Sequence, residues 1–350
     1  GVGGAAPGSV LEWGSRDGVG RGGTGGRGGR RADGSGRQQK HGRTVRNPLL
    51  GVADPPAVGA IYLRHAPPTV MSAPNLAVKC RGDRRDLHRH PEPAWCEYYT
   101  TARLLAELET REIDDRLFGS AIHAADARRN VPDESTLSEW RQRAENAGIN
   151  EAILAQIGEG YTGAVAVVER GSGPTVALRV DIDALPITEA DNDDHQPARG
   201  GFRSTNEGFM HACGHDAHAT IGLGVLDRVL DSDVAGTFKL IFQPAEETIS
   251  GAKSIAESGV LDDVDVFLAP HIGLDHPSGE VVAGIDDFLA VRQFEATFRG
   301  ASAHAGARPE DGDNAVGAMA AGVQNLYAIP RNAAGGTRVN AGRGGGGTAS

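Results

Sequence analysis

Apolar and polar positions along the chain predict alternating helices and strands from about residue 83 onward. An apolar face at helical spacing runs through 97–108, a less regular one through 133–157, and a third through 217–230. Short apolar runs typical of buried strands occupy 164–169, 175–181, 236–242 and 264–269. Strands that alternate with helices predict an α/β domain with a largely parallel sheet.

The pattern changes after residue 286. Alternation over 291–298 predicts a strand, and 314–327 carries one apolar helical face before a glycine-rich segment begins at Arg343. A strand and a helix amount to about half of an α+β domain. We therefore divide the chain into an extension (1–72), a first domain (73–287) and a partial second domain (288–350).

The first 70 residues differ in composition from the rest. They hold 18 of the chain's 50 glycines and show no sustained helical or strand period. Such a segment buries too little apolar surface to offset the entropy lost on ordering, so we predict disorder for 1–72. Two alternatives stay open: an Arg/Gly arm that binds RNA, and translated sequence upstream of a true start at Met71, the first methionine.

Charge and cysteine content narrow the class of protein. The formal net charge is −11, which argues against nucleic acid or an anionic membrane surface as partner. No apolar run approaches the roughly 20 residues that a membrane-spanning helix needs. The three cysteines are odd in number and show no disulfide spacing, which predicts a reduced, cytoplasmic protein.

The densest cluster of metal-ligand side chains lies at 210–218, M-H-A-C-G-H-D-A-H, directly before an apolar helix. Cys213 and His215 stand two apart, so both can reach one ion from a turn at the start of that helix. The alternative is a buried cysteine beside solvent-facing histidines. His88 and His90, which flank an arginine beside prolines, are more typical of packing near a helix than of ligands.

Further candidate ligands follow the predicted strands. Glu246 and Glu247 come after the strand at 236–242, His271 after the strand at 264–269, and Asp181 and Asp183 end the strand at 175–181. The reactive crevice of an open α/β sheet lies beyond the carboxyl ends of its strands. The two glutamates alone also suit a helix N-terminus, where acids favour the helix dipole. Together, the set predicts a hydrolytic site for a divalent metal.

These motifs resemble the di-metal amidohydrolases that include aminoacylases, hippurate hydrolases and indoleacetyl-amino-acid hydrolases. The landmarks of the resemblance are R-R-D-L-H-R-H-P-E, R-V-D-I-D-A-L-P-I, M-H-A-C-G-H-D-A-H, F-Q-P-A-E-E, A-P-H-I-G and G-A-S-A-H-A-G, in family order. Within the family, the chain looks most similar to the A-subunit type of p-aminobenzoyl-glutamate hydrolase. That similarity rests on G-G-F-R-S-T-N-E-G, D-D-V-D-V-F, V-Q-N-L-Y-A-I-P-R and the helical insertion near 122–160.

The resemblance implies a metallopeptidase-like catalytic domain, with a mixed, largely parallel sheet and helices on both faces, and an incomplete α+β lid or dimerisation domain. It implies that two divalent ions, Mn or Zn, are held by Cys213, His215, Glu247 and His271. Glu246 matches the general base, which takes a proton from metal-activated water and delivers it to the leaving amine. Asp181, Asp183 and Asp216 match groups that orient the ligands rather than bind metal.

His304, in S-A-H-A-G, matches a lid-domain histidine that in relatives enters the active site of the partner subunit, where it stabilises the oxyanion. The alternative is an ordinary histidine at a strand end. The resemblance also implies a homodimer through the lid domain and a possible second subunit. Relatives have another metal-binding His and a substrate-binding Asn that nothing in this chain matches. We therefore expect the 350-residue chain to be a fragment and to be inactive as it stands.

The expected activity is metal-dependent hydrolysis of the amide bond in an N-acyl or N-aroyl amino acid such as p-aminobenzoyl-glutamate. The expected partner is therefore a small-molecule substrate, with no nucleic acid and no membrane. Alternatives are a dipeptidase or carboxypeptidase of the same fold, and an inactive truncated product that only binds metal or pairs with an intact copy of the enzyme. Zn, Co and Mn all suit a Cys, His and carboxylate set, and the subtype favours Mn.

Overall fold

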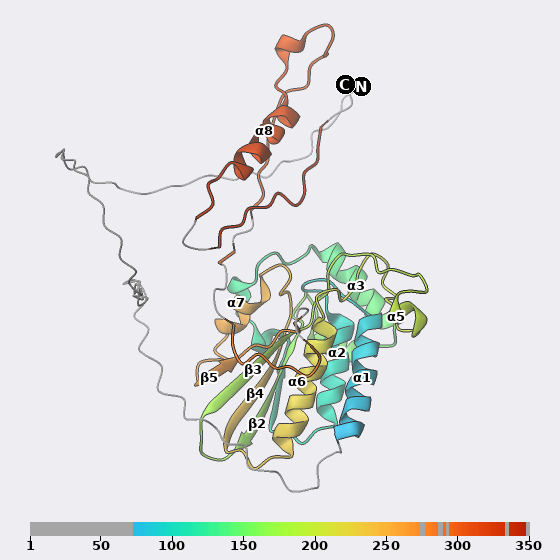
Figure 1. Ribbon diagram of the computed structural model, residues 1–350, viewed down its shortest axis with the longest axis vertical. Coiled ribbons are helices and arrows are strands. Elements are labelled where there is room, and N and C mark those ends of the chain that lie inside the picture. The colour runs from blue at the N-terminus through green and yellow to red at the C-terminus, as the bar shows by residue number, and fades with distance from the viewer. Residues whose placement is uncertain (1–72, 274–276, 286–289, 292–293, 333–335, 348–350) are drawn as a thin grey trace, which may run out of the picture. The chain divides into compact units, whose positions relative to one another are not determined.

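The computed structural model describes residues 73–273, 277–285, 290–291, 294–332 and 336–347 (Figure 1). The segment predicted to be disordered, 1–72, lies outside the described residues. The structure therefore leaves both that prediction and the RNA-binding alternative untested.

A five-stranded mixed sheet forms the centre of the described residues 73–273 (Figure 1). Its strands are β1 (Asp115–Phe118), β2 (Ala164–Arg170), β3 (Thr175–Asp181), β4 (Gly236–Gln243) and β5 (Val266–Leu268), in the spatial order β1-β2-β4-β3-β5. β3 pairs in parallel with β4 and with β5. β2 pairs antiparallel with β1 and with β4. The sheet is thus mixed, and its parallel part comprises β4, β3 and β5.

Eight α-helices accompany the strands in the described residues. They are α1 (Ala73–Arg89), α2 (Tyr98–Glu109), α3 (Glu134–Asn146), α4 (Glu151–Gln156), α5 (Gln196–Arg199), α6 (His215–Leu230), α7 (Gly251–Ala256) and α8 (Ala315–Tyr327). The predicted helical stretch 133–157 is two helices, each started by a side-chain cap. Asp133 accepts from the backbone N–H of Thr136, and Asn150 accepts from that of Ala152.

Helices cover both faces of the sheet, as the family resemblance implies. On one face, Leu87 of α1, Leu104 of α2 and Leu223 of α6 pack against the strands in one buried cluster. On the other face, Ile255 of α7 belongs to a second buried cluster with Val165 of β2. β2 supplies alternate residues to the two clusters, because successive strand side chains point to opposite faces. This double burial explains why β2 reads as a continuous apolar run.

Two elements differ from the sequence predictions. Within the described residues, the first helix is α1 (Ala73–Arg89), whereas the apolar pattern predicted no helix before 97; α1 contains few apolar side chains. Lys79 compensates by pairing with Asp83 of α1 and Glu107 of α2. The strand predicted at 291–298 is wrong over its described part, because 294–298 has no strand. A strand needs a partner to take its backbone hydrogen bonds, and alternation alone does not supply one.

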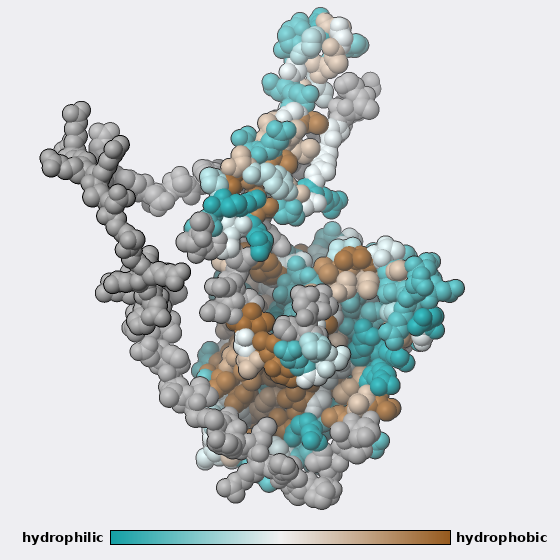
Figure 2. Space-filling model, viewed as in Figure 1, coloured by the Kyte–Doolittle hydropathy of each residue, from teal (hydrophilic) through white to brown (hydrophobic). Residues whose placement is uncertain are grey.

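Two elements of the described chain, α8 and β5, leave apolar side chains exposed. α8 has no buried residue, although its sequence carries the predicted apolar face. In the first domain, Val266, Phe267 and Leu268 of β5 stay 40–51% exposed. Figure 2 shows hydrophobic residues gathered over this edge of the sheet, and hydrophilic ones over α3 and α5. No helix within the described ranges is long and apolar enough to cross a membrane.

Candidate metal centre

The predicted ligands meet where the parallel strands end. Asp181 closes β3, Glu246 and Glu247 follow β4, and His271 follows β5. Cys213 and His215 lie at the start of α6, around Gly214. Gly214 has φ +87°, and a side chain there would overlap Ile272, so the tight turn requires glycine. The parallel half of the sheet and one helix start thus bring side chains from four segments together.

His215 is the centre of this group. Its ring is fully buried, and its Nδ1 forms a hydrogen bond with Asp183 Oδ1 at 3.1 Å. Its Nε2 lies 3.6 Å from both Asp181 Oδ1 and Glu247 Oε1, and 3.8 Å from Glu246 Oε2. These distances are too long for hydrogen bonds, and this buried Nε2 has no partner among the described residues. A lone nitrogen surrounded by carboxylate oxygens is the arrangement that a cation would complete.

His271 presents its ring in the same way. Its Nδ1 lies 2.8 Å from the carbonyl oxygen of Ile272, an acceptor, so Nδ1 carries the proton. Nε2 then carries the lone pair, and it contacts the thiol of Cys213, another candidate ligand, at 3.4 Å. Histidine ligands of metals characteristically bond the other ring nitrogen to a carboxylate or backbone carbonyl. Both His215 and His271 meet that description.

Among the described residues, three sets of side chains lie close enough to share an ion. They are Cys213 with His215 and His271; His215 with Glu246 and Glu247; and Asp181 with His215 and His218. In the third set, His218 has no free nitrogen. Its Nδ1 bonds Asp181 Oδ1, and its Nε2 accepts from the backbone N–H of Ile272 at 3.0 Å. We therefore assign His218 to holding Asp181 and the turn that carries His271.

The charge of the centre also favours a cation. Burial and the charges of Glu247 and Glu246 raise the pKa of the Cys213 thiol to about 11. Burial and the neighbouring carboxylate of Asp183 raise the pKa of Glu247, although His215 opposes the shift. Burial alone would lower the pKa of His215, but its bond to Asp183 and the surrounding carboxylates raise it to about 9. The carboxylate excess suits a bound divalent ion, which would reverse these shifts.

Asp183 links two candidate ligands. One of its oxygens bonds His215 Nδ1, and the other accepts from the backbone N–H of Glu247 at 2.9 Å. Burial would raise the pKa of Asp181, but its bond to His218 and the charges of His215 and Arg179 lower it to about 2. Asp183 thus bonds both His215 and Glu247, whereas Asp181 bonds His218 and lies 3.6 Å from His215 Nε2.

Asp216 and His304 stand apart from these contacts. Asp216 Oδ2 lies 2.7 Å from Arg84 Nε and 2.8 Å from His88 Nδ1, so its carboxylate faces α1. His304 is exposed, and its Nδ1 accepts from the backbone N–H groups of Gly306 and Ala307, both at 3.1 Å. Neutral His304 therefore carries its proton on Nε2, which is the nitrogen left free to donate.

The sequence patterns did not single out two buried side chains, His218 and Glu97. His218 is in the M-H-A-C-G-H-D-A-H motif, but nothing there distinguishes a ligand from a residue that holds one. Glu97 lies at the start of α2 and reaches a backbone N–H 148 residues along the chain. The available signal was an acid inside the apolar segment P-A-W-C-E-Y-Y, where full burial demands a partner.

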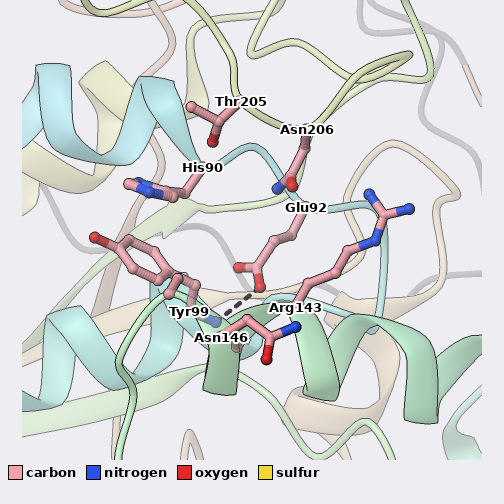
Figure 3. Close-up of a pocket in the computed structure, with 9 residues that line it drawn as sticks. His90, Glu92, Tyr99, Arg143, Asn146, Thr205 and Asn206 are labelled. Atoms are coloured by element: carbon pink, nitrogen blue, oxygen red, sulfur yellow. Dashed lines mark hydrogen bonds between the residues drawn. The ribbon is translucent and has the colours of Figure 1, made fainter.

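A separate pocket of about 280 Å³ shares no residue with the three ligand sets (Figure 3). Its walls come from the segment after α1, the start of α2, α3 and the loop before α6. Figure 3 shows Glu92 inside it, beside the backbone of Tyr99, whose N–H donates to Glu92 Oε1 at 2.7 Å. Both oxygens of Glu92 are taken by backbone N–H groups, so we assign it a structural role.

Comparisons with known proteins show which proteins this chain is similar to. Residues 177–341 match the model of the peptidase family M20/M25/M40. Over 263 residues, the chain is 46% identical to the indole-3-acetyl-aspartic acid hydrolase of Enterobacter agglomerans, covering 74% of this chain and 60% of that protein. Over 272 residues, it is 44% identical to the A subunit of p-aminobenzoyl-glutamate hydrolase from Escherichia coli, covering 77% and 62%.

A solved structure is also similar to this chain. The aminobenzoyl-glutamate utilization protein from Klebsiella pneumoniae superposes with a TM-score of 0.63 at 38% identity, covering 79% of this chain and 64% of that one. The chain thus spans about 60% of the length of the curated relatives named above. The matched family model, these relatives and the fold confirm the resemblance predicted from the sequence: residues 177–341 are similar to the peptidase family M20/M25/M40.

Proposed function

We propose that the protein is a metal-dependent amidohydrolase that cleaves the amide bond of N-acyl or N-aroyl amino acids, with p-aminobenzoyl-glutamate as the favoured substrate. The observation that carries the proposal is the buried Nε2 of His215, unpartnered among the described residues and surrounded by three carboxylates. The named activities of two relatives, on indole-3-acetyl-aspartic acid and on p-aminobenzoyl-glutamate, support the substrate class.

In this proposal, Cys213, His215, Glu247 and His271 hold two divalent ions. Bound divalent ions would polarise the scissile carbonyl and lower the pKa of water. Asp183 fixes the ring of His215 through Nδ1, and Asp181 lies beside Nε2 of the same ring. Asp216 anchors the first turn of α6 to α1, next to His215. Mn is the favoured metal, with Zn and Co as alternatives for this ligand set.

Glu246 is the proposed proton carrier. Its side chain is 38% exposed, more than Glu247 at 18%, so water and substrate can reach it. Its carboxylate lies 3.8 Å from His215 Nε2, close enough to accept a proton from a water at the centre. The proton would then pass to the nitrogen of the leaving amine, which departs as a neutral amine.

The remaining assignments are also proposals. His304 would donate from Nε2 to the oxyanion in the site of a partner protomer, within a homodimer built through the lid domain. The name of the Escherichia coli relative, which describes one subunit of a hydrolase, supports a complex with a second kind of chain. The three free cysteines Cys80, Cys96 and Cys213 support a cytoplasmic location.

The test is release of p-aminobenzoate from p-aminobenzoyl-glutamate with Mn²⁺ added, measured on the protein translated from its complete reading frame. We expect release that a chelator abolishes. Glu246→Ala should lower turnover by about 10²- to 10⁴-fold while leaving Mn²⁺ binding intact, because the side chain moves protons rather than binding metal. Unchanged turnover in that variant would contradict the role of Glu246. Cleavage of dipeptides but of no acyl amino acid would replace the proposed substrate class.

A further inference from the structure

Glu97 is a completely buried acid whose two oxygens bond two different segments. Its Oε1 accepts from the backbone N–H of Ala245 at 2.8 Å, and its Oε2 accepts from the hydroxyl of Thr162 at 2.6 Å. Thr162 precedes β2, and Ala245 immediately precedes Glu246 and Glu247. Glu97 therefore joins the start of α2 to the turn that carries the two glutamates of the candidate centre.

That turn holds a strained residue. Ala245 has φ +54°, in the left-handed region that residues other than glycine rarely adopt. Its N–H is bonded to Glu97, and its carbonyl oxygen accepts from the backbone N–H groups of Ser250 and Gly251 at 3.1 and 3.0 Å. Such a conformation persists only when the surrounding bonds determine it. Among the described residues, the Glu97 contact is the only bond to the Ala245 N–H.

Two buried carboxylates thus hold the turn from opposite sides. Asp183 bonds the N–H of Glu247 and the ring of His215, while Glu97 bonds the N–H of Ala245. Between the two anchored N–H groups lies Glu246. We propose that Glu97 is a positioning residue, which fixes the Ala245–Glu247 turn so that Glu247 can bind metal and Glu246 can reach the reacting water. This inference rests on the proposed metal centre and adds a residue to it.

The hydrogen bond from the Ala245 N–H requires an acceptor oxygen at position 97, but that acceptor does not have to be charged. Burial, together with the charge of Asp183, raises the pKa of Glu97. Glutamine in its place keeps a carbonyl oxygen for the Ala245 N–H and can donate its amide to Thr162. Alanine leaves the Ala245 N–H buried without an acceptor, and aspartate is too short to span both partners.

Glu92 provides a matched control. It lies five residues earlier, is 1% exposed, and accepts two backbone N–H bonds from Tyr99 and Thr100. Burial raises its pKa to about 8, even though the bonds from Thr100 and Tyr99 oppose the shift. Its carboxylate touches no residue of the three ligand sets. Glu92→Ala therefore removes an equally buried acid without disturbing the turn.

The experiment is isothermal titration of the 350-residue chain with Mn²⁺, with the melting temperature of each variant recorded beside it. We expect Glu97→Ala to weaken Mn²⁺ binding by about 10- to 100-fold, the usual cost of losing a residue that orients a ligand. Glu97→Gln should bind Mn²⁺ as the wild type does. Glu92→Ala should melt at a lower temperature and bind Mn²⁺ as the wild type does.

The outcomes separate this inference from the proposed metal centre. If the wild type binds no Mn²⁺ or Zn²⁺, the metal centre itself fails, and the role of Glu97 fails with it. If the wild type binds metal and folded Glu97→Ala binds it equally well, only the role of Glu97 is overturned. Equal losses in Glu92→Ala and Glu97→Ala would also overturn it, because they would indicate a general loss of stability. Should Glu97→Ala not fold, Glu97→Asp makes the same comparison.

Discussion

Two buried histidines of the first domain are both surrounded by acids, yet they differ in what their rings leave free. His88 bonds Asp216 through Nδ1 at 2.8 Å and Glu189 through Nε2 at 3.0 Å. Because carboxylates accept at both nitrogens, both nitrogens of His88 donate, and the ring is an imidazolium. His215 bonds Asp183 through Nδ1 and leaves Nε2 without a partner in the described part of the chain.

The difference teaches how to distinguish a structural histidine from a candidate ligand. A histidine with two bonded nitrogens ties segments together: His88 joins α1 to the start of α6 and to the loop that contains Glu189. A histidine with one bonded and one open nitrogen keeps a lone pair for a ligand. His218 falls on the structural side by this criterion, because both of its nitrogens are bonded. His271 falls on the ligand side, because its Nε2 contacts the thiol of Cys213, which is itself a candidate ligand.

The largest expected effect comes from removing each ring in turn. His215→Ala should weaken Mn²⁺ binding by more than the roughly 100-fold that loss of an orienting residue costs, because it removes a ligand atom. His88→Ala should weaken Mn²⁺ binding far less than His215→Ala does. It should lower the free energy of unfolding by about 2–3 kcal/mol, because it removes buried hydrogen bonds to two carboxylates that keep Arg84 and His195 as partners. Metal titration and urea denaturation of both variants measure this contrast. Equal weakening of Mn²⁺ binding in both variants would contradict the distinction between His88 as a structural histidine and His215 as a candidate ligand.

A smaller effect concerns a third buried histidine, His123. Burial lowers its pKa to about 4, although its bond to the carbonyl oxygen of Thr162 opposes the shift. The unfolded chain takes up this proton near pH 6.5 and the folded chain only near pH 4. Between these values the unfolded state binds more protons, so the stability from neutral His123 is lost as the pH falls. His88, whose pKa is raised by its acid partners despite burial, gives the opposite sign: its contribution is lost as the pH rises.

His123→Gln should therefore flatten the acid side of the stability profile. The slope attributable to one proton is at most about 1.4 kcal/mol per pH unit. Urea denaturation of the wild type and the variant at several pH values from 7 down to 4 gives the comparison. The same slope in both proteins would show that His123 does not stay neutral when buried.

The sequence was most informative where chemistry and topology coincide. The proximity of Cys213, His215, Glu247 and His271 was predictable, because ligand-type side chains follow predicted strands or open a helix, and parallel strands end at one edge of a sheet. Glu97 and His218 were not, because their roles depend on backbone N–H groups far away in the chain, at Ala245 and Ile272.

The fold shows the same limit. Apolar periodicity predicted β2, β3, β4 and α6, since each buries a regular set of side chains. It missed α1, whose polar sequence is held partly by charge pairs such as that between Lys79 and Glu107. It also predicted a strand over 291–298 that the described residues 294–298 do not form. Local pattern specifies which face of a segment is apolar, whereas pairing depends on partners elsewhere.

The most direct measurement is the absorption spectrum of the chain loaded with Co²⁺, compared with that of Cys213→Ser. In the proposed centre, the thiolate of Cys213 and the rings of His215 and His271 are close enough to bind one ion, so the wild type should show a thiolate-to-cobalt charge-transfer band that the variant lacks. The band should appear although the pKa of the Cys213 thiol is raised to about 11 without metal, because the ion stabilises the thiolate. Absence of the band, or its persistence in Cys213→Ser, would contradict the proposed metal centre.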